Sequence, residues 1–175
     1  MPIKHVTGDI LSSGASFIVI PVNTVGVMGA GLAKQVKSIL MRKPGMRRAY
    51  TAPTGWGEYL TACDNNADFK ACRSVVDYPH YDDKFGAVFV FLATKQDWRN
   101  PSKLEWVKSG LASLRQLLEK ETPRWTAEAR TVAIPALGCG LGGLCWGDVE
   151  EAIENALGDL DKWQVTCYLP DSKRR

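Results

Sequence analysis

Two glycine-rich stretches each lie between an apolar strand-like run and a segment with helical spacing. The first reads IVIPVNTVGVMGAGL over residues 18–32, and the second reads VAIPALGCGLGGLCWGDV over residues 132–149. Backbone N–H groups in such a loop, beside a helix N-terminus, can bind an anion. Two loops of this kind therefore predict one cleft that holds a diphosphate from two sides. Simple turn chemistry is the alternative, and it explains one loop more easily than two.

A lysine follows a third apolar run. Ala87 to Leu92 predicts a buried strand that stops at Ala93-Thr94-Lys95, and Asp97-Trp98-Arg99 follows in a loop. A lysine at a strand end is usually only solvated, and this segment alone favours that interpretation. Open α/β sheets, however, bind their ligands at the carboxyl ends of strands, so the position of Lys95 is compatible with a site.

Neither glycine loop is one of two familiar phosphate-binding motifs. The first has the glycine spacing of a P-loop, but Leu32-Ala33 stands where lysine and a hydroxyl residue are required. Gly138, Gly140 and Gly143 of the second match G-x-G-x-x-G. A dinucleotide-binding fold needs further βαβ units after this fingerprint, and too little chain follows it. A nicotinamide-dependent dehydrogenase is therefore disfavoured.

Composition excludes several other classes. The five cysteines contain no C-x-x-C pair and the chain has two histidines, so we predict no metal site. Cys139 and Cys167 are expected to be small buried hydrophobic residues. The odd cysteine count and the lack of an apolar N-terminal signal or membrane-length run favour a cytoplasmic protein. A net charge of +3 is too small to indicate nucleic-acid binding by itself.

Apolar runs and helical spacing alternate along the chain, which predicts an α/β fold with a mixed sheet between helices. We expect a single domain over residues 1–170 and a basic tail at 171–175. Ser102 and Glu105 predict a capping box at the start of the longest helix. The expected strands are 3–6, 17–22, 87–92, 131–135 and 164–169, with one or two short ones within 57–84; the expected helices are 32–42, one from about 102 and 148–157.

Four spaced motifs together resemble the macrodomain family. They are Gly8-Asp9-Ile10, Pro21-Val22-Asn23, Gly29-Ala30-Gly31-Leu32 and PALGCGLGGL at residues 135–144. Within the family, ATK at 93–95, WR at 98–99 and Trp146 after the second loop are most similar to the DarG-type branch. Those proteins are antitoxins that remove ADP-ribose from thymidine in DNA. The resemblance implies a three-layer α/β/α macrodomain that acts as a monomer on ADP-ribose or ADP-ribosylated DNA, with an ADP-ribosyltransferase toxin as a further partner.

The resemblance also implies roles for individual residues. Lys95 would act at the anomeric carbon of ADP-ribose, since a lysine amine is suited to carbonyl chemistry, and Asn23 would position the distal ribose. Asp9 would accept a hydrogen bond from the adenine amino group; as a residue after a turn glycine, its simpler role is that of a cap. No metal or cofactor is implied. The full set of implied ligand contacts is Asp9, Ile10, Gly29, Ala30, Gly31, Leu32, Thr94, Trp98, Gly138, Cys139, Gly140, Leu141, Gly142, Tyr168 and Leu169.

One departure bears on the substrate. Related protein-directed glycohydrolases place an aspartate roughly where Gly142 stands, and this chain has no carboxylate between Gly138 and Trp146. The DNA-directed branch is therefore favoured, and a basic rim with Arg47, Arg48 and Arg99 would suit a polyanionic substrate. The alternatives are an ADP-ribose-binding module without turnover, or a hydrolase of ADP-ribose 1″-phosphate, O-acetyl-ADP-ribose or protein-linked ADP-ribose.

Overall fold

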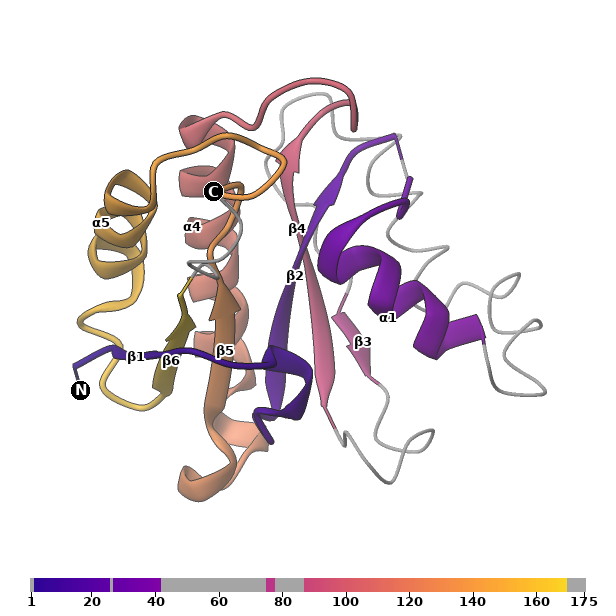
Figure 1. The fold of residues 1–175 in the computed structure, drawn as a ribbon. Helices are drawn as coiled ribbons and strands as arrows, with labels where there is room; N and C mark the ends of the chain where they lie inside the picture. The colour runs from indigo at the N-terminus through magenta and orange to yellow at the C-terminus, as the bar shows by residue number, and fades with distance from the viewer. Residues whose placement is uncertain (1, 26, 42–74, 78–86, 170–175) are drawn as a thin grey trace.

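The computed structural model describes residues 2–25, 27–41, 75–77 and 87–169, and it has three layers. Helices α4 (Leu104–Glu121) and α5 (Trp146–Leu157) cover one face of a central sheet, and α1 (Gly31–Met41) covers the other (Figure 1). Short 3-10 turns are η1 (Ile10–Ser12), η2 (Thr122–Arg124) and η3 (Ala127–Ala129). The α/β/α arrangement predicted from the alternating pattern is confirmed.

In the described part of the chain the sheet has six strands in the order β1-β6-β5-β2-β4-β3. Strand β3 is antiparallel to β4, and the other neighbours are parallel, so the expected mixed sheet is confirmed. The strands are β1 (Lys4–Val6), β2 (Phe17–Asn23), β3 (Val75–Asp77), β4 (Val88–Lys95), β5 (Thr131–Pro135) and β6 (Gln164–Tyr168).

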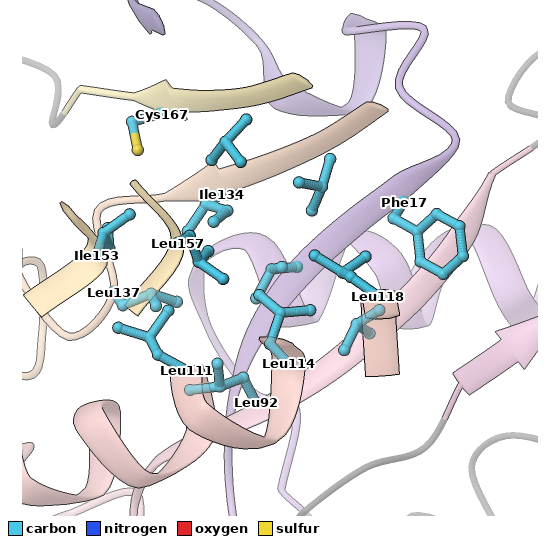
Figure 2. Packing of buried hydrophobic residues seen from close by; sticks show 14 of the residues in the cluster. Phe17, Leu92, Leu111, Leu114, Leu118, Ile134, Leu137, Ile153, Leu157 and Cys167 are labelled. Atoms are coloured by element: carbon cyan, nitrogen blue, oxygen red, sulfur yellow. The ribbon is translucent and has the colours of Figure 1, made fainter. Parts of the chain in front are cut away.

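The central strands are apolar on both faces because both faces are covered by helices. Along β2, Phe17 and Val19 belong to the core under α4 and α5, whereas Ile18 and Ile20 belong to the core under α1. Strand β4 alternates in the same way. Figure 2 shows Leu111, Leu114 and Leu118 of α4 packed with Ile153 and Leu157 of α5 against the sheet. A core of this kind fixes the strand ends, and hence the loops that leave them, relative to one another.

Two local predictions were wrong. Strand β4 does not stop at Leu92 but runs to Lys95, because its pairing with β2 continues to the end of both strands. The predicted capping box is absent: α4 begins at Leu104, and its N-cap residue Lys103 makes no side-chain capping hydrogen bond. Ser102 is buried and binds elsewhere, as described below.

The other elements lie close to their predicted bounds. Strand β5 matches its predicted range, α5 begins at Trp146 rather than Asp148, and β6 ends one residue before the predicted Leu169. Gly158 follows α5 as expected, and its N–H donates to the carbonyl of Glu154. The Arg47 and Arg48 part of the predicted basic rim and the predicted tail at 171–175 lie outside the described residues.

Candidate functional site

The carboxyl ends of the parallel strands bring most of the predicted site residues to one edge of the sheet. Asn23 ends β2, Lys95 ends β4, and the two are paired across the strands after a register shift. The second glycine loop leaves the same edge after Pro135, the last residue of β5. The loops that follow β2, β4 and β5 gather at the top of Figure 1. This is the edge where open α/β sheets place their ligands.

The first glycine loop is held by Asn23. Its side chain is 7 % exposed. Its Oδ1 accepts from the Val27 N–H at 3.0 Å, and its Nδ2 donates to the Val27 carbonyl at 2.6 Å. The oxygen and the nitrogen of the Asn23 side-chain amide therefore both bind the backbone of Val27, four residues further along the loop. The structure gives Asn23 a positioning role in this loop, and its contact with a ribose stays a prediction.

The first loop ends at the N-terminus of α1. Gly31 has φ +59°, a left-handed conformation that favours glycine, and Lys34 N–H donates to the Ala30 carbonyl to begin the helix. The N–H groups before that bond have no partner within an α-helix. Gly29, Ala30 and Gly31 are exposed, so this helix start presents backbone donors to solvent. A helix start of this kind can bind an anion, and the predicted diphosphate contact of these residues stays a prediction.

The second loop is folded on itself by backbone hydrogen bonds. Leu144 N–H donates to the Gly138 carbonyl at 3.0 Å, and Gly143 N–H donates to the Gly140 carbonyl at 3.1 Å. Cys139 N–H also donates within the loop, to Ala136 at 3.1 Å. That N–H is therefore already engaged, although it was among the predicted diphosphate donors. The N–H groups of the exposed residues Gly140 and Leu141 make no backbone hydrogen bond within the described segments.

A buried serine, Ser102, forms a hydrogen bond to the second loop. Ser102 N–H donates to the Gly142 carbonyl at 2.9 Å, and Ser102 Oγ donates to Thr94 Oγ1 at 3.3 Å. Both hydroxyl residues are buried, at 6 % and 3 % exposure. Thr94, predicted as a ligand contact, thus supports the loop from the interior. Sequence reasoning missed this role of Ser102, because Glu105 three residues later suggested a local cap instead.

Lys95 forms hydrogen bonds both to the second loop and to the residue that follows β2. It is half-buried at the end of β4, and its Nζ donates to the Leu141 carbonyl at 3.2 Å. On the other side, the Lys95 carbonyl accepts from the Thr24 N–H at 3.2 Å. The Lys95 amine therefore lies against the exposed part of the second loop, while the Lys95 backbone is tied to the start of the first. This arrangement combines a nitrogen nucleophile with two sets of backbone anion donors.

The loop after β4 presents Trp98. Asp97 accepts from the Arg99 Nη2 at 2.8 Å, from its Nε at 2.9 Å and from its backbone N–H at 2.9 Å. These hydrogen bonds, led by those from the side chain, lower the pKa of Asp97 to about 2. The pair is therefore ionised at neutral pH. The Arg99 guanidinium carbon lies 5.5 Å from the centre of the Trp98 ring, which is itself 55 % exposed.

The predicted adenine end lies at the β1–β6 side of the same edge. Val6 pairs with Tyr168, and Leu169 N–H donates to the Val6 carbonyl at 2.8 Å. Asp9 caps η1, because its carboxylate accepts from the Leu11 N–H and the Ser12 hydroxyl, each at 3.0 Å. The simpler capping role is thus observed, and the Asp9 side chain is exposed beside it. Ile10 is buried beneath this turn.

In the part of the chain that the structure describes, no group of three or more His, Cys, Asp or Glu side chains could hold a metal ion. Across the same residues, no helix combines the length and apolar character that crossing a bilayer requires.

No family model matches the chain. Among curated proteins, it is 33 % identical over 173 residues to a DNA ADP-ribosyl glycohydrolase of Thermus aquaticus, covering 96 % of this chain and 41 % of that protein. It is 31 % identical over 182 residues to a DNA ADP-ribosyl transferase-DNA ADP-ribosyl glycohydrolase fusion protein of Thermosipho africanus. This match covers 97 % of this chain and 42 % of that protein. The chain thus spans less than half the length of these relatives.

Solved structures match over the whole fold. The macrodomain of Mycobacterium tuberculosis DarG has a TM-score of 0.73 at 31 % identity and covers 97 % of this chain and 98 % of its own. Thermosipho africanus DarTG in complex with ADP-ribose has a TM-score of 0.72 at 29 % identity, and the match covers 99 % of this chain and 43 % of that one. The sheet, its covering helices and the two loops at one edge are those of an α/β macrodomain, and the chain belongs to that family. Within it, the similarity is to the macrodomains of DarG proteins.

Proposed function

We propose that this chain is an ADP-ribosyl glycohydrolase that removes ADP-ribose from a modified thymidine base in DNA. The observation that carries the proposal is the position of Lys95, whose Nζ lies against Leu141 of the second glycine loop. The similarity to DNA ADP-ribosyl glycohydrolases over almost the whole chain supports the same activity. A DNA substrate agrees with the expected cytoplasmic location.

The two loops would bind the diphosphate. The exposed N–H groups at the start of α1 face it from one side, and those of Gly140 and Leu141 from the other. Asp9 and Tyr168, at the β1–β6 side, would border the adenine. This placement leaves the distal ribose beside Asn23 and Lys95, which end neighbouring strands.

Lys95 would then carry out the chemistry. In its neutral form the amine donates its electron pair to C1″ of the ribose, and a C–N bond forms. The glycosidic bond breaks, and its electron pair stays on the base nitrogen, which takes up the proton that the new C–N nitrogen of Lys95 loses. The oxygen of a water molecule then bonds to C1″ as the C–N bond to lysine breaks; the water proton returns to the lysine nitrogen, and ADP-ribose is released. The Leu141 carbonyl, which accepts from Nζ, would hold the amine in place for this attack. The route needs no metal or cofactor.

In the Thermosipho africanus relative the glycohydrolase is fused to a DNA ADP-ribosyl transferase, which supports a transferase as the partner of this chain. We propose that the DNA modification removed by this chain is made by an ADP-ribosyltransferase toxin.

The test is release of ADP-ribose from a thymidine-modified oligonucleotide by the wild type, Lys95→Ala and Lys95→Arg. Both variants should lose turnover by about 10³-fold or more, because neither side chain supplies a neutral amine nucleophile. Lys95→Arg keeps the positive charge and can still donate to the loop carbonyl, so it separates nucleophilic attack from electrostatics. Lys120→Ala, an exposed lysine in the last turn of α4, is the matched control.

The outcomes distinguish the alternatives. Retained turnover in Lys95→Arg would contradict the proposal that Lys95 acts as the nucleophile. If the wild type releases no ADP-ribose from DNA yet binds free ADP-ribose by calorimetry, the chain is a binding module. Turnover of ADP-ribose 1″-phosphate or O-acetyl-ADP-ribose, without turnover of DNA, would identify a small-molecule hydrolase.

A further inference from the structure

The large hydrophobic side chains that are most exposed all lie beside the site. In the described segments these are Val25, Val27, Trp98 and Leu141, with exposures of 50 %, 42 %, 55 % and 81 %. They come from the three loops that follow β2, β4 and β5. Exposed apolar side chains beside polar groups mark a surface that binds a ligand or a partner. Of the four, only Trp98 offers an aromatic face.

The structure holds Trp98 in a defined position. Asp97 and Arg99, on either side of it, are joined by three hydrogen bonds of 2.8–2.9 Å, and Asn100 N–H donates to the Asp97 carbonyl at 3.1 Å. The short loop is thus closed on itself although its tryptophan points to solvent. A side chain that is presented rigidly loses little conformational freedom when it binds a partner.

The chemistry of this loop suits a nucleobase. A tryptophan stacks on any base, because every base has a π-face, and the contact is worth about 1–3 kcal/mol. Arg99 donates through Nε and Nη2 to Asp97, and the five N–H groups of a guanidinium leave further donors for a phosphate oxygen. Its side chain is 69 % exposed. Since Asp97 already offsets the charge of Arg99, stacking rather than charge would dominate the contact.

The distance between Lys95 and Trp98 restricts which base of the DNA can stack on Trp98. Trp98 follows Lys95 by three residues, so their Cα atoms are at most about 11 Å apart. With Lys95 at the modified nucleotide, this span reaches roughly one to three nucleotides along a strand, taking about 3.4 Å per stacked nucleotide. We propose that Trp98 stacks on an unmodified base that neighbours the ADP-ribosylated one, with Arg99 beside the adjoining phosphate. The inference rests on the proposed function and adds a site for the flanking DNA.

The experiment compares two substrates, an ADP-ribosylated oligonucleotide and the ADP-ribosylated thymidine nucleoside. In Trp98→Ala the ratio of kcat/KM for the oligonucleotide to that for the nucleoside should fall about 5–150-fold, the factor equivalent to the stacking energy above. The loss should appear in the KM of the oligonucleotide. Trp98→Phe keeps an aromatic face and should retain most of the ratio, whereas Trp98→Leu, apolar without a π-system, should not.

Abasic substitutions then locate the base. Each nucleotide within three of the modified one is replaced in turn by an abasic site. The wild type should show a raised KM at one position, and Trp98→Ala should be insensitive there, which is the signature of a direct coupling between the two groups. Because Trp98 is exposed, its variants should keep the thermal midpoint of the wild type, which excludes unfolding as the cause.

Two results would overturn this inference alone. One is turnover of the oligonucleotide with the same abasic profile in the wild type and Trp98→Ala. The other is an unchanged substrate ratio together with lost binding to an ADP-ribosyltransferase, which would make this loop a protein-docking surface. Failure of the wild type to act on either substrate would instead contradict the proposed function.

Discussion

Replacing Gly142 with alanine should disrupt the second loop. A Cβ built at this position would lie 2.8 Å from the Ser102 Cβ and still closer to the Ser102 Oγ and the Gly138 carbonyl oxygen. The carbonyl is part of a backbone turn, so it cannot rotate away as a long side chain could. The backbone of Gly142 itself is not in the left-handed region, and the clash is therefore purely one of packing.

The size of the effect follows from overpacking, which typically costs about 1–3 kcal/mol. For a chain of this length, each kcal/mol shifts the thermal midpoint by roughly 2–4 °C, so Gly142→Ala should melt about 2–12 °C below the wild type. Because the loop must move away from Ser102, the neighbouring N–H groups of Gly140 and Leu141 are displaced as well. The affinity for ADP-ribose should fall about 10-fold or more, equivalent to roughly 1.4 kcal/mol.

Gly140→Ala is the matched control in the same loop. Its added Cβ would meet nothing within 4 Å, and its backbone is likewise outside the left-handed region. Stability should be unchanged or raised by up to about 1 kcal/mol, since alanine restricts the unfolded chain. Differential scanning calorimetry and titration with ADP-ribose measure both quantities. A Gly142→Ala protein that melts and binds ADP-ribose like Gly140→Ala would refute the packing that we describe.

Other predictions concern Asn23 and the cysteines. Asn23→Ala should destabilise the chain by about 1–3 kcal/mol, because it removes two part-buried hydrogen bonds to the backbone of Val27, each worth about 0.5–1.5 kcal/mol; faster amide exchange at Val27 would locate the loss, and unchanged exchange would contradict it. Burial raises the pKa of the Cys139 thiol to about 11. Thiolate is the reactive form, so at pH 8 a maleimide should label the exposed Cys145 well before Cys139, with labelling of Cys139 rising only as the pH approaches that pKa. Peptide mass mapping measures both sites, and equal labelling at pH 8 would show that Cys139 is not shielded.

The sequence was sufficient to predict the frame of the site. Strand 131–135 is a short apolar β-branched run, and its predicted bounds are those of β5. Asn23, Lys95 and the second loop each end or follow a predicted strand, and because the carboxyl ends of parallel strands lie at one edge of a sheet, their common edge could be expected. The start of the helix after the first loop could also be predicted from its apolar spacing: α1 begins at Gly31, one residue before the expected Leu32. Whether the backbone at residues 29–32 binds a diphosphate stays a prediction.

The support that Ser102 gives the site could not be predicted, because it is a contact between distant parts of the chain. Ser102 binds Gly142 and Thr94 only after β4, α4 and the second loop have been brought together. A local pattern with Glu105 instead suggested a helix cap, which the structure does not form. The tie between Asn23 and Val27 is local and could have been recognised, since asparagine commonly binds nearby backbone in turns.

The packing around Gly142 also bears on the substrate. A resemblance to protein-directed glycohydrolases would place an aspartate near this position, but any side chain here meets Ser102 and the Gly138 carbonyl. A carboxylate at residue 142 could therefore not approach Lys95 without rebuilding the loop. Lys95 instead donates to a backbone carbonyl, that of Leu141. The lysine is thus positioned by the glycine loop itself, and the glycine at 142 is a requirement of that loop. This geometry favours a glycohydrolase in which the lysine acts without a carboxylate from the second loop, in agreement with the DNA-directed activity that we propose.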